Sequence, residues 1–177
     1  DLQNEKITAI TGVPTQTWDI LNHPEKDKYD LSSLVDLSGG GAPRPPEHVK
    51  RLNDEMEGKP SIGYGLSETN ALGTLNAGDD YLKHPSSCGR AVPPVTDVAI
   101  VDQDWNFLNE GDHGEVVIKS PANMIGYWDN PDATDEVFND EGWFKTGDLG
   151  YMKDDFLFIV DRVKDLVIRR SEEHTSE

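Results

Sequence analysis

The sequence has few of the features that mark oxidised, membrane-spanning or secreted proteins. Its 177 residues include one cysteine, Cys88, which excludes an internal disulfide framework and fits a reducing compartment. No apolar run approaches the length that crosses a membrane, and no basic-then-apolar leader opens the chain. We therefore expect a cytoplasmic protein without a transmembrane segment. Cys88 also lacks the local context of a catalytic thiol, so we interpret it as structural.

Positive charge is equally scarce. The chain has 16 Lys and Arg against 34 Asp and Glu, a formal net charge of −18. Such an excess of negative charge argues against nucleic acid and anionic membrane surfaces as partners. An anionic small molecule could bind only where local donors or a metal cation offset this charge.

The stretch 62–69, Ile-Gly-Tyr-Gly-Leu-Ser-Glu-Thr, is the most informative part of the chain. Two glycines flank Tyr64, so the backbone can turn sharply and a flat ligand can approach it closely. The Ser67 hydroxyl could donate to a phosphate oxygen, and the Glu68 carboxylate could hold Mg²⁺ beside it. Taken alone, the same residues also fit a tight loop with a solvated glutamate.

The first part of the chain predicts an α/β unit with a parallel sheet. A strand at 34–37 runs into a glycine loop at 39–43. The helix that follows has apolar residues at positions i, i+3 and i+7: Val49, Leu52 and Met56. We expect Gly58 as its C′ residue. Ligands bind such sheets at the carboxyl ends of strands, so the glycine loop and the Tyr64 loop should emerge at one edge.

From about Asn76 onward, the sequence consists of short β-rich runs separated by turns. These runs are 97–102, 115–119 and 156–160. They predict a small antiparallel sheet or an open barrel. Within this part, Asn130 is expected to cap a short helix that begins at Pro131. We accordingly divide the chain into an α/β subdomain, 1–78, and a β-rich subdomain, 79–161.

Four motifs occur in a fixed order: 38–43, 62–69, 143–149 and 160–165. Together they resemble the adenylate-forming (AMP-binding) superfamily, which includes acyl-CoA synthetases, beetle luciferases and the adenylation domains of peptide synthetases. The resemblance runs from about residue 13 to residue 169. The connecting stretch 120–128, Ser-Pro-Ala-Asn-Met-Ile-Gly-Tyr-Trp, is most similar to fatty-acid and other carboxylate–CoA ligases.

The resemblance implies a fold. The chain would be the C-terminal part of the large N-terminal domain, with a parallel sheet unit followed by a small distorted β-barrel. Residues 162–169 match the family's hinge, with Lys164 as the residue whose backbone rotates. Residues 170–177 depart from the family's Gly-Gly-Glu-Asn continuation and resemble a translated sequencing-library adapter, so we expect a non-native tail.

The resemblance also implies that this chain is incomplete. It begins with Asp1, and it shows neither the family's upstream phosphate-binding loop nor the lid domain with its catalytic lysine. By itself the fragment is therefore expected to be inactive.

The implied activity is ATP-dependent activation of a carboxylic acid. In the family, a carboxylate attacks the α-phosphate of ATP in the presence of Mg²⁺, which gives an acyl-adenylate and pyrophosphate. A thiol, usually coenzyme A, then displaces AMP and forms a thioester. For this chain the resemblance implies a fatty or other apolar acid as substrate, with ATP, Mg²⁺ and coenzyme A.

Residue roles carry over by resemblance. The expected nucleotide-binding residues are Gly40, Gly41, Ala42, Pro43, Tyr64, Gly65, Ser67, Asp148 and Arg162. Residues 40–43 would line one side of the adenine, and Tyr64 would cover the other. The Asp148 carboxylate would accept both ribose hydroxyls, although a plain turn aspartate is the alternative. Arg162 would reach the ribose or phosphates, unless it forms a surface ion pair with Asp161 or Asp165.

The expected catalytic residues are Ser67, Glu68 and Arg162. Ser67 replaces the family's usual threonine and keeps the hydroxyl for the α-phosphate. Glu68 would be the metal ligand. Gly65, Leu66 and Ala71 would border the acyl pocket.

Other functions stay open beside the ligase. A luciferase-like enzyme or another adenylation domain fits the same motifs, although peptide-synthetase domains usually read Tyr-Gly-Pro-Thr-Glu where this chain has Leu66 and Ser67. A non-catalytic AMP- or ATP-binding module is the alternative outside the enzymes.

Trp105 and Asp155 stand where relatives often have turn glycines, so each requires a different turn or a strained φ.

Overall fold

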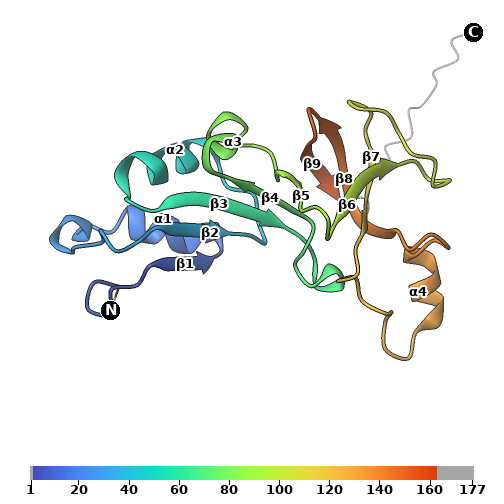
Figure 1. Cartoon of the computed structure of the whole chain (residues 1–177), viewed down its shortest axis with the longest axis horizontal. Coiled ribbons are helices and arrows are strands. Elements are labelled where there is room, and N and C mark those ends of the chain that lie inside the picture. The colour runs from blue at the N-terminus through green and yellow to red at the C-terminus, as the bar shows by residue number, and fades with distance from the viewer. Residues whose placement is uncertain (1, 163–177) are drawn as a thin grey trace, which may run out of the picture.

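The computed structural model describes residues 2–162, which form two β-sheets side by side along the long axis of the molecule (Figure 1). The helices are α1 (Pro14–Leu21), α2 (Pro46–Glu55), α3 (Gly78–Lys83) and α4 (Pro131–Val137), with short 3₁₀ turns η1 (Lys26–Lys28) and η2 (Ser67–Thr69). The strands are β1 (Ala9–Gly12), β2 (Asp36–Gly39), β3 (Lys59–Tyr64), β4 (Thr74–Ala77), β5 (Arg90–Ala91), β6 (Asp97–Val101), β7 (Gly114–Lys119), β8 (Phe144–Lys153) and β9 (Phe156–Arg162). The expected hinge residue Lys164 and the expected tail 170–177 lie outside the described residues.

The first sheet is mixed, with strand order β1-β2-β3-β4-β5. Strands β1, β2 and β3 are parallel, and β4 and β5 are antiparallel to their neighbours. Gly12 pairs with Gly39, and Gly39 pairs with Ile62, so the three parallel strands end at one edge. The glycine loop follows β2 and the Tyr64 loop follows β3. The prediction that both loops emerge at the same edge is therefore confirmed.

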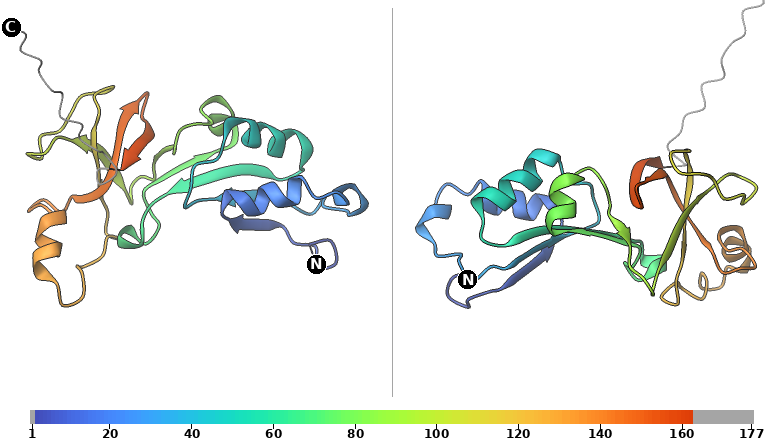
Figure 2. Two further views of the ribbon diagram at one scale, coloured as in Figure 1. Left: turned by 180° about the vertical axis from the view of Figure 1, so that it is seen from behind. Right: turned by 45° about the horizontal axis from the view of Figure 1, so that its top comes forward.

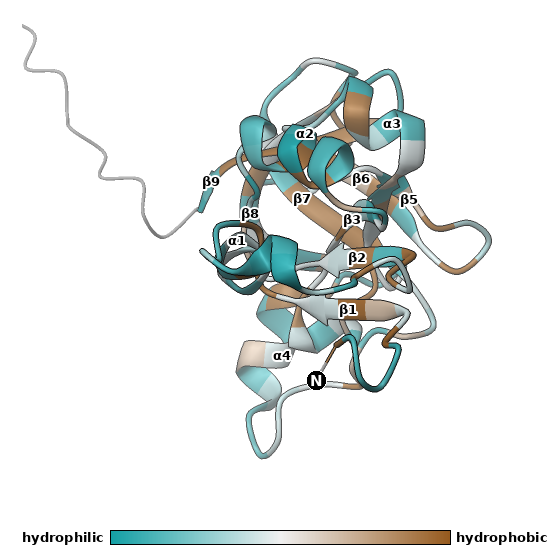
Figure 3. Ribbon diagram, turned by 90° about the vertical axis from the view of Figure 1, so that its left-hand side faces the viewer, coloured by the Kyte–Doolittle hydropathy of each residue, from teal (hydrophilic) through white to brown (hydrophobic). Residues whose placement is uncertain are grey.

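Helices α1, α2 and α3 cover one face of this sheet (Figure 2). One core cluster joins Leu21 of α1, Leu37 of β2 and Leu52 of α2. A second joins Val49 of α2, Ile62 of β3 and Tyr81 of α3. The apolar periodicity of the helix predicted after the glycine loop therefore identified its buried face correctly. Figure 3 shows the same division, with hydrophilic residues over the outer surfaces of α1 and α2.

The predicted role of Gly58 is wrong. Helix α2 ends at Glu55 and Met56 is its C-cap, so Gly58 lies beyond the C′ position. A Cβ added at Gly58 would lie 2.9 Å from Leu37 Cγ and 3.3 Å from the Leu34 carbonyl oxygen. Glycine therefore allows close packing against β2 at this position.

The second sheet is antiparallel, with strand order β6-β7-β8-β9. Its core contains Ile100, Val116 and Leu157, and the three predicted β-rich runs fall in β6, β7 and β9. The predicted antiparallel sheet is confirmed, but the described residues form an open four-stranded sheet and not the barrel that the resemblance implied. Leu157 of β9 instead exchanges backbone hydrogen bonds with Cys88 and Gly89, so this strand meets the segment before β5.

The change from the first sheet to the second falls between β5 and β6. Strands β4 and β5 belong to the first sheet, which extends to Ala91, and β6 begins at Asp97. The division into subdomains at 78 and 79 remains a prediction.

Within the described part of the chain, no helix has the length and apolarity needed to cross a membrane.

Two expected backbone strains are present. Trp105 has a φ of 66°, and the Lys145 ammonium lies 4.2 Å from the centre of its ring. Asp154 and Asp155 have φ values of 52° and 65° in the two-residue turn between β8 and β9. Positive φ at both positions is the requirement of a type I′ hairpin turn, which aspartate tolerates better than most residues.

Helix α4 also begins as predicted, with the Asn130 side chain accepting a hydrogen bond from the Ala133 N–H.

Candidate nucleotide-binding site

The glycine loop leaves β2 directly beside the end of β3. A Cβ added at Gly40 would lie 3.2 Å from the Gly63 carbonyl oxygen, and Gly41 has a φ of 74°, which favours glycine. Ala42 and Pro43 are exposed. The wall that residues 40–43 would offer to a ligand is therefore made mainly of backbone.

The loop after β3 folds back on itself. A Cβ added at Gly65 would lie 2.4 Å from the carbonyl carbon of Ala71, so no side chain fits there. The Ala71 N–H donates to the Leu66 carbonyl over 2.8 Å, and the Thr69 hydroxyl accepts from the Leu66 N–H. Ala71 has a φ of 61°, outside the range that alanine prefers. The structure thus brings together the three residues expected to border the acyl pocket, whose role remains a prediction.

A three-residue polar cluster joins the two sheets. The Tyr64 hydroxyl, on β3, donates to Asp148 Oδ2, on β8, over 2.7 Å. The Arg162 guanidinium, on β9, lies with its Nε 3.4 Å from Asp148 Oδ1. Burial raises the pKa of Tyr64, and the neighbouring Asp148 raises it further, so its hydroxyl stays a donor. Tyr64 and Arg162 lie 98 positions apart in the sequence, yet both contact Asp148 in the structure.

The Asp148 side chain is 9% exposed, and its carboxylate still has acceptor capacity. A carboxylate offers about four lone-pair sites, and Tyr64 and Arg162 occupy about two of them. The Arg162 side chain is 73% exposed, and its ion pair runs to Asp148 rather than to the neighbouring Asp161. Both residues can therefore still meet a ligand at this edge of the second sheet.

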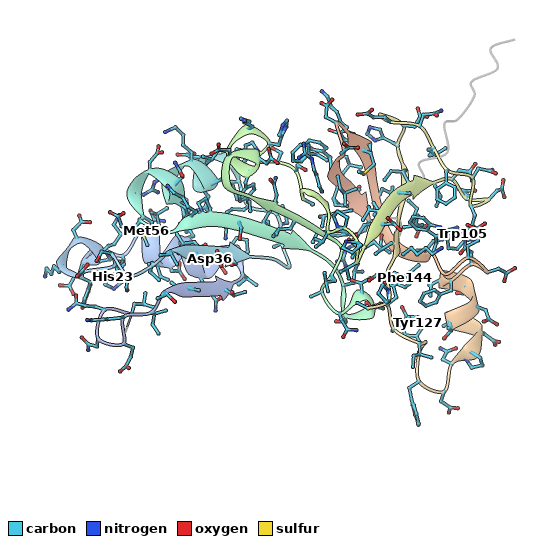
Figure 4. The ribbon with its side chains drawn as sticks, viewed as in Figure 1. His23, Asp36, Met56, Trp105, Tyr127 and Phe144 are labelled. Carbon is cyan, nitrogen blue, oxygen red and sulfur yellow. The ribbon has the colours of Figure 1, made fainter. Side chains whose placement is uncertain are left out.

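The Glu68 carboxylate has one protein partner that the sequence did not indicate. The Tyr127 hydroxyl donates to Glu68 Oε1 over 3.0 Å. Tyr127 lies in the segment that leads from β7 to α4 (Figure 4). This segment also meets the Tyr64 loop through the Met124 N–H, which donates to the Glu68 carbonyl, and through Asn70. No local pattern could have predicted a pair that lies 59 residues apart.

The residues around Glu68 fit Mg²⁺ only together with a nucleotide. No group of three or more His, Cys, Asp or Glu that could hold a metal occurs within residues 2–162. Mg²⁺ typically binds one or two carboxylates, several waters and the phosphates of its substrate. Glu68, partly buried beside the exposed Ser67, suits the role of such a single protein ligand.

Two further groups, one partly buried and one buried, lie outside this site. Burial raises the pKa of the Cys88 thiol to about 11, which keeps it protonated and supports its interpretation as structural. Arg44, directly after the glycine loop, is buried and donates from Nη1 to the Ser61 carbonyl over 3.3 Å. No sequence pattern indicated a role for Arg44, and arginine is mostly an exposed residue type.

Known proteins with similar sequences are adenylate-forming enzymes. The chain is 42% identical over 171 residues to the long-chain-fatty-acid–CoA ligase of Salmonella typhimurium, covering 95% of this chain and 30% of the ligase. It is 40% identical over 172 residues to the luciferin 4-monooxygenase of Luciola mingrelica, covering 94% and 30%. The chain thus spans about a third of the length of these relatives.

Solved structures show the same similarity. The fatty acyl CoA synthetase of Mycobacterium tuberculosis matches with a TM-score of 0.84 and 35% identity, covering 94% of this chain and 33% of that one. The O-succinylbenzoate coenzyme A synthetase of Bacillus subtilis, in complex with ATP and magnesium ion, matches with a TM-score of 0.85 and 26% identity, covering 97% and 35%. The AMP-binding enzyme family matches residues 1–128. The chain therefore belongs to the AMP-binding enzyme family.

Proposed function

We propose that this chain is the nucleotide-binding part of a carboxylate–CoA ligase that activates a fatty or other apolar acid. The observation that carries the proposal is that Tyr64 and Arg162 both contact Asp148, at the sheet edge from which the glycine loop and the loop with Glu68 emerge. These groups supply a flat aromatic ring, an acceptor for a vicinal diol, a fixed cation and a metal ligand, which together match the parts of ATP.

The proposed roles follow from this placement. The adenine would lie between residues 40–43 and the Tyr64 ring, and the ribose hydroxyls would donate to Asp148. Ser67 would donate to the α-phosphate, and Glu68 would hold Mg²⁺, which offsets the negative charge of the phosphates. The chain carries a formal net charge of −18, so this local compensation is essential for binding a polyanion.

The acid would enter beside Gly65, Leu66 and Ala71. Their apolar character suits an aliphatic or aromatic acyl group. Catalysis of the first step would rest on in-line positioning of the carboxylate against the α-phosphate rather than on a covalent intermediate with the protein. Coenzyme A would accept the acyl group in the second step.

Acid-dependent ATP–pyrophosphate exchange by the full-length protein that carries this sequence tests the proposal. We expect exchange with medium-chain or long-chain fatty acids, and thioester formation when coenzyme A is added. Exchange without thioester formation would indicate an adenylating enzyme with another acceptor, such as a luciferase-like protein. ATP binding without exchange for any aliphatic or aromatic acid would favour a non-catalytic nucleotide-binding module.

A further inference from the structure

Tyr127 contacts the proposed metal ligand directly. Its hydroxyl donates to Glu68 Oε1 over 3.0 Å, although the two residues lie 59 positions apart. Tyr127 is 38% exposed, so it lies at the surface. A tyrosine at the surface has no need of a protein partner, because water satisfies its hydroxyl equally well.

The Tyr127 hydroxyl is not required to hold the two loops together. Two other hydrogen bonds already join them, from the Met124 N–H to the Glu68 carbonyl over 2.6 Å and from Asn70 Nδ2 to the Ala122 carbonyl over 2.7 Å. Both use backbone carbonyl groups and fix the path of the chain. The bond from Tyr127 is different because it fixes the position of the Glu68 carboxylate itself.

The arrangement leaves Glu68 able to bind a cation. A single hydroxyl occupies one of about four lone-pair sites on the carboxylate, so Oε2 and part of Oε1 stay available. The donor is an uncharged phenol hydroxyl, which shares one proton with Glu68 Oε1. A neutral donor orients the carboxylate without cancelling the negative charge that attracts a divalent cation.

We propose that Tyr127 is a positioning residue that orients the Glu68 carboxylate for divalent metal in the nucleotide complex. This inference rests on the proposed function, because it takes Glu68 as the metal ligand. It adds a residue from the segment 120–127 to the site, whereas the motifs place every metal-related group in the Tyr64 loop. Partners of metal ligands typically change metal affinity by about 10- to 100-fold when removed.

The test compares Tyr127→Phe with wild type in the full-length protein. Binding of Mn²⁺ in the presence of a non-hydrolysable ATP analogue is measured by electron paramagnetic resonance, and the free Mg²⁺ dependence of pyrophosphate exchange is measured beside it. We expect metal affinity to fall about 10-fold or more, with the exchange rate recovering at saturating Mg²⁺. Tyr29→Phe is the matched control, since Tyr29 is 53% exposed and lies on the distant loop before β2.

A double-mutant cycle separates positioning from structure. In the Glu68→Gln background, Tyr127→Phe should cause no further loss of Mn²⁺ affinity, since the carboxylate that it orients is gone. Unchanged Mn²⁺ affinity in Tyr127→Phe, or an equal loss in both backgrounds, would overturn the inference. A lower yield of folded protein does not affect the reading, because the half-saturating metal concentration is independent of the amount of active protein. Suppose that wild type binds Mn²⁺ with the analogue but that none of the acids tested supports pyrophosphate exchange. The ligase proposal then fails, and the metal titration still decides the role of Tyr127.

Discussion

Removing the Tyr64 hydroxyl should weaken ATP binding while leaving the aromatic ring in place. The hydroxyl donates to Asp148 Oδ2 over 2.7 Å, and hydrogen bonds to charged groups contribute about 1.5–3 kcal/mol. The other partner of Asp148 is weaker, because the Arg162 side chain is mostly exposed and its Nε lies 3.4 Å away, a geometry worth about 0–1 kcal/mol. Tyr64 is therefore the main group that positions the Asp148 carboxylate.

From these magnitudes, Tyr64→Phe should raise the KM for ATP about 10-fold, which corresponds to about 1.4 kcal/mol. The free energy of unfolding should fall by about 1.5–3 kcal/mol, the contribution of the lost hydrogen bond. The assay is pyrophosphate exchange by the full-length protein at varied ATP concentration, with thermal melting measured in parallel. Tyr151→Phe is the control, because Tyr151 lies on the same strand as Asp148 and stacks on Phe158 instead. Wild-type KM and melting temperature in Tyr64→Phe would refute the reasoning.

Four further substitutions probe the same edge and the core behind it, and one of them is a control. Asp148→Ala should raise the KM for ATP by at least about 10-fold, since the ribose loses its acceptor; wild-type ATP affinity would rule out the ribose role. Gly65→Ala should destabilise the loop by about 1–3 kcal/mol and abolish exchange, because the new Cβ meets the Ala71 backbone at 2.4 Å. Gly63→Ala, whose nearest contact would be 3.7 Å, should be tolerated, and equal effects of the two changes would contradict this account. For His48, burial followed by the charges of Arg44 and Arg51 lowers the pKa from 6.5 to about 4. The unfolded chain thus takes up the proton first, so stability is complete above pH 6.5 and falls as the pH drops toward 4. The full shift corresponds to about 3 kcal/mol, and we expect about 1–2 kcal/mol because Trp18, which packs on the ring, is itself half-exposed. Urea unfolding should show this slope in wild type and lose it in His48→Gln; an equal slope in both would show that His48 stays hydrated.

Periodicity and turn chemistry predicted the local elements that depend on neighbouring residues. The i, i+3 and i+7 pattern of α2 identified Val49 and Leu52 as buried, and Asn130 capped α4 as expected. The ten-residue strand β8 was missed, because Gly147 and Gly150 interrupt the apolar alternation that predicts a strand. Its place in the sheet is fixed by pairing with β7 and β9, which the local sequence does not encode.

The candidate site was predictable in part. The motifs predicted Tyr64, Glu68, Asp148 and Arg162 as site residues, because the family resemblance assigns positions by residue type and order; their roles remain predictions. The contacts between them were not predictable. That Tyr64 donates to Asp148, and that Tyr127 donates to Glu68, depends on how the second sheet packs against the edge of the first. The error over the barrel has the same origin, since sheet closure depends on contacts between strands far apart in the sequence.

A crystal structure of the full-length protein with AMP and Mg²⁺ would test the central claim most directly. We predict that the adenine lies between residues 40–43 and the Tyr64 ring, with both ribose hydroxyls within hydrogen-bond distance of Asp148. Clear density for the nucleotide at another place, with Asp148 still bonded only to Tyr64 and Arg162, would contradict the assignment of this edge as the nucleotide-binding site.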